Sequence, residues 1–208
     1  MLFRSVSWGL STDVPVAGDF DGDGKADPAI YRPSTGLWAI LKSSTGYSTS
    51  TIVSWGLSTD LPVPGDYDGD GRADPAIYRP STGLWAILKS STGYSTSTTV
   101  SWGLSTDVAV PGDYDGDGKI DPAIFRPSTG LWALLKSSTG YASSSTVSWG
   151  LSSDVPVPAD FDGDGKTDPA IFRPSTGVWS MLKSSTGYAS ATSVSWGLST
   201  DVPIYQRP

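Results

Sequence analysis

The 208-residue sequence contains no cysteine, histidine, glutamate or asparagine. Without cysteine it has no disulfide, zinc-thiolate site or thiol nucleophile. Without histidine it has no imidazole base and none of the usual nitrogen ligands of transition metals. Apolar runs long enough for a membrane-spanning helix are also missing, so no membrane span is expected. These absences exclude most catalytic chemistry, and we expect the chain not to be an enzyme.

Negative charge dominates the sequence, and aspartate carries all of it. The chain has 21 acidic residues, 14 lysines and arginines and a formal net charge of −7. This balance argues against binding to nucleic acid or to an anionic membrane surface, because both demand a basic face. The hydrophobic fraction of 38% and the nine tryptophans are sufficient for a packed core. We therefore expect a folded protein whose acidity has a specific cause.

The sequence is a tandem repeat. The motif Val-Ser-Trp-Gly-Leu-Ser begins at Val6 and recurs with a constant spacing of 47 residues. Because no linker or change of composition interrupts the repeats, residues 1–208 are expected to form a single domain. Four full copies and a truncated fifth copy span residues 6–52, 53–99, 100–146, 147–193 and 194–208.

Each copy reads as four short strands separated by turn residues. In the copy 53–99, the turn Pro80–Gly83 separates two apolar segments, 75–79 and 84–89. Both the odd and the even positions of 84–88 are apolar, which predicts a strand covered on both faces. Strands of this kind are typical of propeller blades, each of which lies between two neighbours. The predicted fold is an all-β propeller of four near-identical, four-stranded blades, with an open solenoid as a weaker alternative.

The two ends of the chain depart from the repeat. Residues 2–5 and 204–208 both echo the second strand of a copy, without the aspartate-rich loop that normally precedes it. We expect the segments 1–5 and 194–208 to meet and close the ring, with or without a small composite fifth blade. A head-to-tail homodimer that forms an eight-bladed ring is an alternative to the monomeric ring, since a heterologous contact can close a ring.

A nine-residue loop with carboxylates at positions 1, 3, 5 and 9 occurs once in each copy. Its first example is Asp19-Phe-Asp-Gly-Asp-Gly-Lys-Ala-Asp27. Positions 1, 3 and 5 of an EF-hand loop also supply side-chain oxygens, position 6 is glycine and position 7 supplies a backbone carbonyl. The predicted metal ligands are Asp19, Asp21, Asp23, the Lys25 carbonyl and Asp27; Asp66, Asp68, Asp70, the Arg72 carbonyl and Asp74; Asp113, Asp115, Asp117, the Lys119 carbonyl and Asp121; Asp160, Asp162, Asp164, the Lys166 carbonyl and Asp168.

Oxygen ligands without nitrogen or sulfur favour calcium, at about one ion per loop and so about four per chain. An EF-hand proper is excluded, because Ile30 stands at position 12 and Pro28 blocks a following helix. Plain turns are the simplest alternative, but four crowded carboxylates repel one another unless one is protonated or a cation binds. Catalytic carboxylates are the other alternative, and they need a second carboxyl across the substrate, which one loop does not supply.

These motifs resemble the FG-GAP repeat, also known as the VCBS-type repeat, of integrin alpha-subunit propellers and many secreted bacterial proteins. The resemblance rests on Trp55-Gly56, on the run from Pro64 to Gly71 and on the run from Asp74 to Pro80, and it recurs in all four full copies. It implies a propeller with calcium in the loop between the first two strands of each blade, outside the cell, in adhesion or ligand binding. Four copies are fewer than the seven typical of the family.

Two further sets of residues invite a functional interpretation. The tryptophans within the apolar strand are expected in the core between blades, as are those that precede glycine, from Trp8 to Trp196. An alternative is a multivalent lectin in which indoles stack on sugar rings and arginines bind hydroxyl groups. The candidate ligand-binding residues are Trp38, Trp85, Trp132, Trp179, Arg32, Arg79, Arg126 and Arg173.

Taken together, the sequence predicts a non-catalytic, calcium-stabilised interaction module that is secreted and binds a protein or glycan. A purely structural or designed repeat scaffold that binds only calcium is a further alternative.

Overall fold

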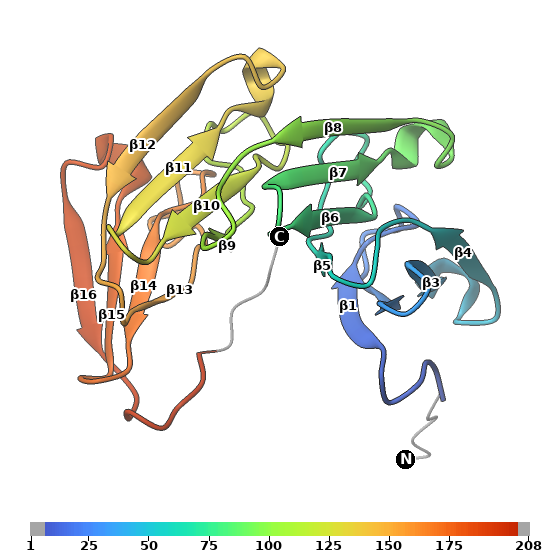
Figure 1. The fold of residues 1–208 in the computed structure, drawn as a ribbon, viewed down its shortest axis with the longest axis horizontal. Helices are drawn as coiled ribbons and strands as arrows, with labels where there is room; N and C mark the ends of the chain where they lie inside the picture. Colours follow the sequence, from blue (N-terminus) through green and yellow to red (C-terminus); the bar gives the residue numbers. More distant parts are fainter. Residues whose placement is uncertain (1–6, 204–208) are drawn as a thin grey trace.

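The computed structural model describes residues 7–203, which form four four-stranded antiparallel sheets arranged as a four-bladed propeller. Figure 1 shows the sheets following one another around a common centre, with the first strand of each sheet nearest the centre and the fourth outermost. Each sheet is a meander in which consecutive strands are neighbours. The predicted fold class is therefore confirmed.

The blades are offset from the sequence copies, since the copy 53–99 begins within the last strand of blade 1. The strands are β1 (Val14–Gly18), β2 (Asp27–Arg32), β3 (Leu37–Leu41) and β4 (Ser50–Ser54) in blade 1; β5 (Leu61–Pro62), β6 (Ala76–Arg79), β7 (Leu84–Leu88) and β8 (Ser97–Ser101) in blade 2; β9 (Val108–Ala109), β10 (Ala123–Arg126), β11 (Leu131–Leu135) and β12 (Ser144–Ser148) in blade 3; and β13 (Val155–Pro156), β14 (Ala170–Arg173), β15 (Val178–Leu182) and β16 (Ala191–Ser195) in blade 4.

The turn between the second and third strands of each blade depends on glycine. In blade 1 the N–H of Gly36 donates to the carbonyl oxygen of Arg32 at 2.9 Å, and Gly36 has a φ of +66°. A Cβ atom at this position would collide with the carbonyl oxygen of Gly56. Glycine is therefore required both for the left-handed backbone and for the close approach of the segment that leaves the blade.

The core lies between blades rather than within one sheet. Trp38, Trp85 and Trp132 in the third strands of blades 1 to 3 are fully buried, at 0% exposure. In the first interface, Trp38 and Phe20 of blade 1 pack with Ile77 and Ala73 of blade 2. The prediction that the third strand is covered on both faces is thus confirmed for β3, β7 and β11, whereas β15 in blade 4 is mostly half-buried.

The predicted closing segments fall partly outside the described residues. Residues 1–6 and 204–208 are not described, so closure of the ring by the segments 1–5 and 194–208 stays a prediction. The helices within residues 7–203 are three-residue 3-10 turns, and none has the length and apolar character needed to cross a membrane.

Candidate metal sites

The aspartate-rich loop connects the first two strands of each blade, and its first aspartate organises it. In blade 1 one carboxylate oxygen of Asp19 accepts the N–H groups of Gly22 and Asp23, at 2.7 and 3.2 Å. The other oxygen accepts the N–H of Gly24 at 2.7 Å. Gly22 and Gly24 have φ values of +82° and +81°, which a side chain would disfavour. The alternation of aspartate and glycine thus wraps the backbone around the Asp19 carboxylate.

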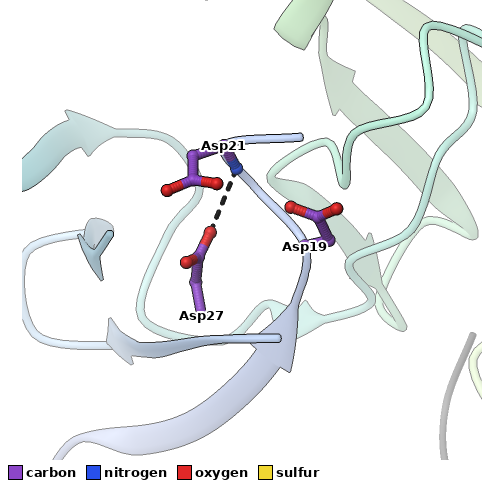
Figure 2. Close-up of side chains that lie close together, drawn as sticks. All are labelled: Asp19, Asp21 and Asp27. Carbon is purple, nitrogen blue, oxygen red and sulfur yellow. Dashed lines mark hydrogen bonds between the residues drawn. The ribbon is translucent and has the colours of Figure 1, made fainter. Parts of the chain in front are cut away.

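The last aspartate of the loop closes it from the inside. Asp27 is fully buried, and its Oδ2 atom accepts the N–H groups of Phe20 and Asp21 at 2.9 and 3.0 Å. Its Oδ1 atom accepts the N–H of Ser43 at 2.7 Å. Figure 2 shows the Asp27 carboxylate facing the main chain of Asp21, with the Asp19 carboxylate on the neighbouring part of the loop. Asp27 therefore joins the loop to the turn after β3.

Carboxylate oxygens converge in every blade. Three aspartates in each loop place one oxygen apiece within 4.8 Å of one another, and they are Asp19, Asp21 and Asp27; Asp66, Asp68 and Asp70; Asp113, Asp115 and Asp121; Asp160, Asp162 and Asp168. Positions 1 and 3 are shared by all four groups. Position 9 completes three of the groups, and position 5 completes the group of blade 2.

The remaining predicted ligands lie nearby in different surroundings. In blade 2, Asp74 is outside the group of three but is fully buried and keeps the bonds seen for Asp27, to Tyr67 and Ser90. Asp23 in blade 1 accepts hydrogen bonds from the Ser43 hydroxyl and from Lys25. Asp117 and Asp164 likewise accept bonds from the equivalent serine hydroxyls. Coordination by the backbone carbonyls of Lys25, Arg72, Lys119 and Lys166 stays a prediction.

One carboxylate oxygen in each loop is buried and has no hydrogen-bond partner among residues 7–203. These atoms are the Oδ1 atoms of Asp21, Asp68, Asp115 and Asp162. The second oxygen of Asp21 accepts the Ser44 hydroxyl at 2.7 Å, so the side chain is held in one orientation. A buried polar group that lacks a partner costs about 1–3 kcal/mol, and more when it is charged. The aspartate at the third position of each loop is thus held in place, with one buried oxygen that no group within residues 7–203 satisfies.

Serines that the sequence analysis did not single out complete the site. They belong to the 3-10 turns η1 (Ser43–Thr45), η2 (Ser90–Thr92), η3 (Ser137–Thr139) and η4 (Ser184–Thr186). In each turn the first serine bonds to the aspartates at positions 5 and 9 and the second to the aspartate at position 3, as Ser43 and Ser44 do in blade 1. The recurring Lys-Ser-Ser-Thr-Gly-Tyr motif marks these turns, but nearly every motif in this chain recurs.

The electrostatics of the aspartate-rich loops reflect crowding and burial. Burial raises the pKa of Asp74 to about 6, from an ordinary value of 3.8, and the neighbouring Asp68 carboxylate adds to the shift. Burial likewise raises the pKa of Asp121 to about 6, with a contribution from Asp115. A cation in the cluster would oppose both effects, because it favours the ionised form of each carboxylate.

The candidate sugar-binding residues are engaged inside the protein. Trp38, Trp85 and Trp132 are fully buried, so no sugar ring can stack on them, and Trp179 in blade 4 is half-buried. Each arginine forms a two-pronged ion pair with an aspartate 19 residues earlier, as Arg79 does with Asp60 at 2.7 and 2.8 Å. The other pairs are Arg32 with Asp13, Arg126 with Asp107 and Arg173 with Asp154. These pairs, which the sequence analysis missed, engage the Nε and Nη2 atoms of each guanidinium inside the protein.

No protein-family model and no curated protein matches this sequence. The resemblance to FG-GAP repeats therefore rests on the loop and strand motifs themselves, together with the propeller fold and the acidic cluster in each blade.

Proposed function

We propose that the chain is a calcium-binding propeller that holds one Ca²⁺ in the loop of each blade and serves as a non-catalytic interaction module outside the cell. The observation that carries the proposal is the buried, unpartnered Oδ1 atom of Asp21 and its equivalents in the other three blades. A cation bound there supplies the partner that the protein does not.

The ligand set favours calcium over other cations. Within each loop the converging side-chain atoms that could bind a metal are carboxylate oxygens. The sequence supplies neither cysteine nor histidine for a transition metal. Calcium accepts six to eight oxygens in flexible geometry, and four carboxylates with a main-chain carbonyl come close to that number. Magnesium is smaller, requires a regular octahedron and retains water, so it suits this cluster less well.

In this proposal calcium stabilises the fold. Asp21 in the loop and Asp27 at the start of β2 both accept hydrogen bonds from the turn after β3. An ion held by these carboxylates therefore joins the loop, β2 and this turn. Binding to the folded state alone adds roughly 2.7 kcal/mol per site at a hundredfold excess over the dissociation constant. The extracellular setting, where calcium is abundant, follows from this role and from the resemblance to secreted repeat proteins.

A non-catalytic role is supported by how the aspartates are used. The loop carboxylates face one another and the main chain, and those of Asp19 and Asp27 accept main-chain N–H groups, an arrangement suited to holding a cation. The rigid blades then serve as a scaffold for surface contacts to a partner. The lectin alternative is less well supported, because three of its four tryptophans are buried and its four arginines are paired with aspartates. The described residues give no other observation in its favour.

The test is thermal unfolding in calcium and in a chelator, together with calorimetric titration of the chelated protein. We expect calcium to raise the midpoint strongly, magnesium to raise it less, and the titration to give about four sites. Replacing Asp21, Asp68, Asp115 and Asp162 by asparagine should abolish the calcium response. The matched control is Asp201→Asn, an aspartate outside the loops, which should keep it. A midpoint that calcium does not change would overturn the proposal.

A further inference from the structure

Consecutive blades are joined by a short segment that contacts both the blade before it and the blade after it. In the first interface this linker is Trp55–Asp60. The Trp55 N–H donates to Gly36 of blade 1 at 2.7 Å, and its indole N–H donates to the Ala86 carbonyl oxygen of blade 2 at 2.9 Å. Asp60 at the other end of the linker pairs with Arg79 of blade 2. The linkers Trp102–Asp107 and Trp149–Asp154 repeat these contacts in the second and third interfaces.

Residues 7–203 contain five such linkers and four blades. The last linker, Trp196–Asp201, is seated on blade 4 as the others are seated on theirs, with the Trp196 N–H bonded to Gly177 at 2.8 Å. Its other side meets nothing among residues 7–203: Trp196 is 76% exposed, and neither an acceptor for its indole nor an arginine for Asp201 is present there. The last linker therefore has the conformation of the others, but no blade within the described residues packs against its second side.

The face of blade 4 beside this linker is also uncovered. Phe161 of blade 4 is 43% exposed, whereas the equivalent Tyr67 of blade 2 is 4% exposed beneath blade 3. A hollow of about 540 Å³ lies between Phe172, Trp179 and Trp196. In blades 1 to 3 the next blade packs against the matching aromatic residues with an isoleucine, which is Ile77, Ile124 or Ile171.

Blade 1 presents the complementary surface. Pro15, Ala17 and Ala26 are exposed, whereas their equivalents in blade 2, Pro62, Pro64 and Ala73, are buried, and Ala73 packs in the core cluster of blade 1. The Ala73 N–H donates to the Asp19 carbonyl oxygen of the preceding blade at 2.7 Å, and the next two interfaces repeat this bond at 2.8 and 2.6 Å. Within residues 7–203, no such bond joins the N–H of Ala26 to the carbonyl oxygen of Asp160.

The linker position on blade 1 is occupied by the first linker, Trp8–Asp13. Its indole N–H donates to Ala39 at 3.3 Å, and Asp13 pairs with Arg32 at 2.8 Å. Residues 8–13 and 196–201 have the same sequence, Trp-Gly-Leu-Ser-Thr-Asp. The last linker can therefore replace the first one without loss of any contact to blade 1, and the exchange also buries the exposed faces of blades 4 and 1.

We propose that blade 4 and the Trp196–Asp201 linker dock onto blade 1 of a second copy of this chain, head to tail, in place of that copy's Trp8–Asp13 linker. The joint repeats an interface that each chain already forms three times. A second copy is favoured over closure within one chain because, among residues 7–203, no hydrogen bond and no core cluster joins blade 1 to blade 4, although Ala159 of blade 4 lines the same pocket as Ala17 and Ala26 of blade 1. The contact is heterologous, since the two copies contribute different surfaces.

Cysteine cross-linking tests this proposal cleanly, because the chain contains no cysteine. Ala159 and Ala26 occupy the positions equivalent to Gly18 and Ala73, where a Cβ on Gly18 would lie 2.9 Å from the Cβ of Ala73. The Ala159→Cys and Ala26→Cys variants are prepared separately, loaded with calcium, mixed and oxidised. We expect a disulfide-linked heterodimer in the mixture and none with Ala159→Cys alone. The intrachain pair Gly18→Cys with Ala73→Cys is the control for geometry.

The outcome that overturns the proposal is equally direct. If one chain carrying both Ala159→Cys and Ala26→Cys forms only an intrachain disulfide, and the mixture of single variants forms none, the ring closes within one chain. Light scattering provides an independent readout. Trp196→Ala should abolish association, and Trp8→Ala should strengthen it by vacating the position on blade 1. A monomeric mass for both variants and for the unsubstituted chain at all concentrations would contradict head-to-tail docking.

Discussion

Asp74 and Ser90 are 16 residues apart, yet the buried Asp74 carboxylate accepts the Ser90 N–H at 2.7 Å. The same carboxylate accepts the Tyr67 N–H at the start of the loop, at 3.0 Å. One side chain thus holds the aspartate-rich loop against the turn that follows the third strand. The conformation of the loop that carries the candidate metal site therefore depends on this carboxylate.

Replacing Asp74 by asparagine should destabilise the protein even without calcium. The amide keeps the size of the side chain but presents only one acceptor oxygen to main-chain N–H groups on two sides. We expect a loss of about 1–3 kcal/mol in the free energy of unfolding, measured by urea denaturation in a chelator. Asp201→Asn, which removes an aspartate charge outside the loops, serves as the control and should change stability little at a protein concentration where chains do not associate.

Stability without calcium should fall as the pH rises from about 4 to about 6. The pKa values of Asp74 and Asp121 are about 6 in the folded protein against an ordinary 3.8, so the folded state binds more protons than the unfolded state in this range. Calcium should remove or reverse this trend, because it favours ionised carboxylates. Urea denaturation at several pH values, with chelator and with calcium, measures both curves. The Asp74→Asn and Asp121→Asn double variant should lose the decline, and its persistence there would refute the assignment.

Arg79→Lys should weaken the joint between blades 1 and 2. The guanidinium of Arg79 holds both oxygens of the buried Asp60 carboxylate, and a lysine ammonium cannot reproduce this two-pronged geometry. We expect a cost of roughly 1–3 kcal/mol in chemical denaturation, since a buried carboxylate loses part of its compensation. Arg72→Lys makes the same substitution at an exposed arginine of the same blade. Equal effects of the two substitutions would refute the structural role of the pair.

Trp85→Ala and Trp179→Ala should have unequal effects although the two tryptophans occupy equivalent positions in blades 2 and 4. Trp85 is fully buried between blades, so its removal should cost about 3–5 kcal/mol. Trp179 is half-buried on the uncovered face of blade 4, so its removal from the isolated chain should cost clearly less. Denaturation at low protein concentration, where association is minimal, gives the comparison. Equal costs would show that blade 4 is covered in the single chain.

Much of this architecture can be predicted from the sequence because it depends on local pattern. The 47-residue period, the turn at Gly36 and the doubly apolar third strand each reflect a constraint that operates within one repeat. The carboxylates of the aspartate loops converge for the same reason, since aspartate and glycine at fixed spacing determine how the loop turns.

Other features depend on contacts that no single repeat reveals. The Arg79–Asp60 pair and the serines of the 3-10 turns recur in every copy, but bland positions recur as well, so recurrence alone did not distinguish them. Sequence periodicity also treats every blade as equivalent. It could not show that Phe161 and Trp196 at the end of the series lack the neighbour that covers their equivalents.

The main-chain bond from Ala73 to the carbonyl oxygen of Asp19 has a consequence for how the loops fill. It connects the loop of blade 1 to the loop of blade 2, and the equivalent bonds continue through blades 3 and 4. Ordering one loop therefore partly orders the next, as in a linear chain of coupled units. Calcium uptake should accordingly be steeper than that of four independent sites. The two outermost loops, with one neighbour each, should respond differently from the inner pair.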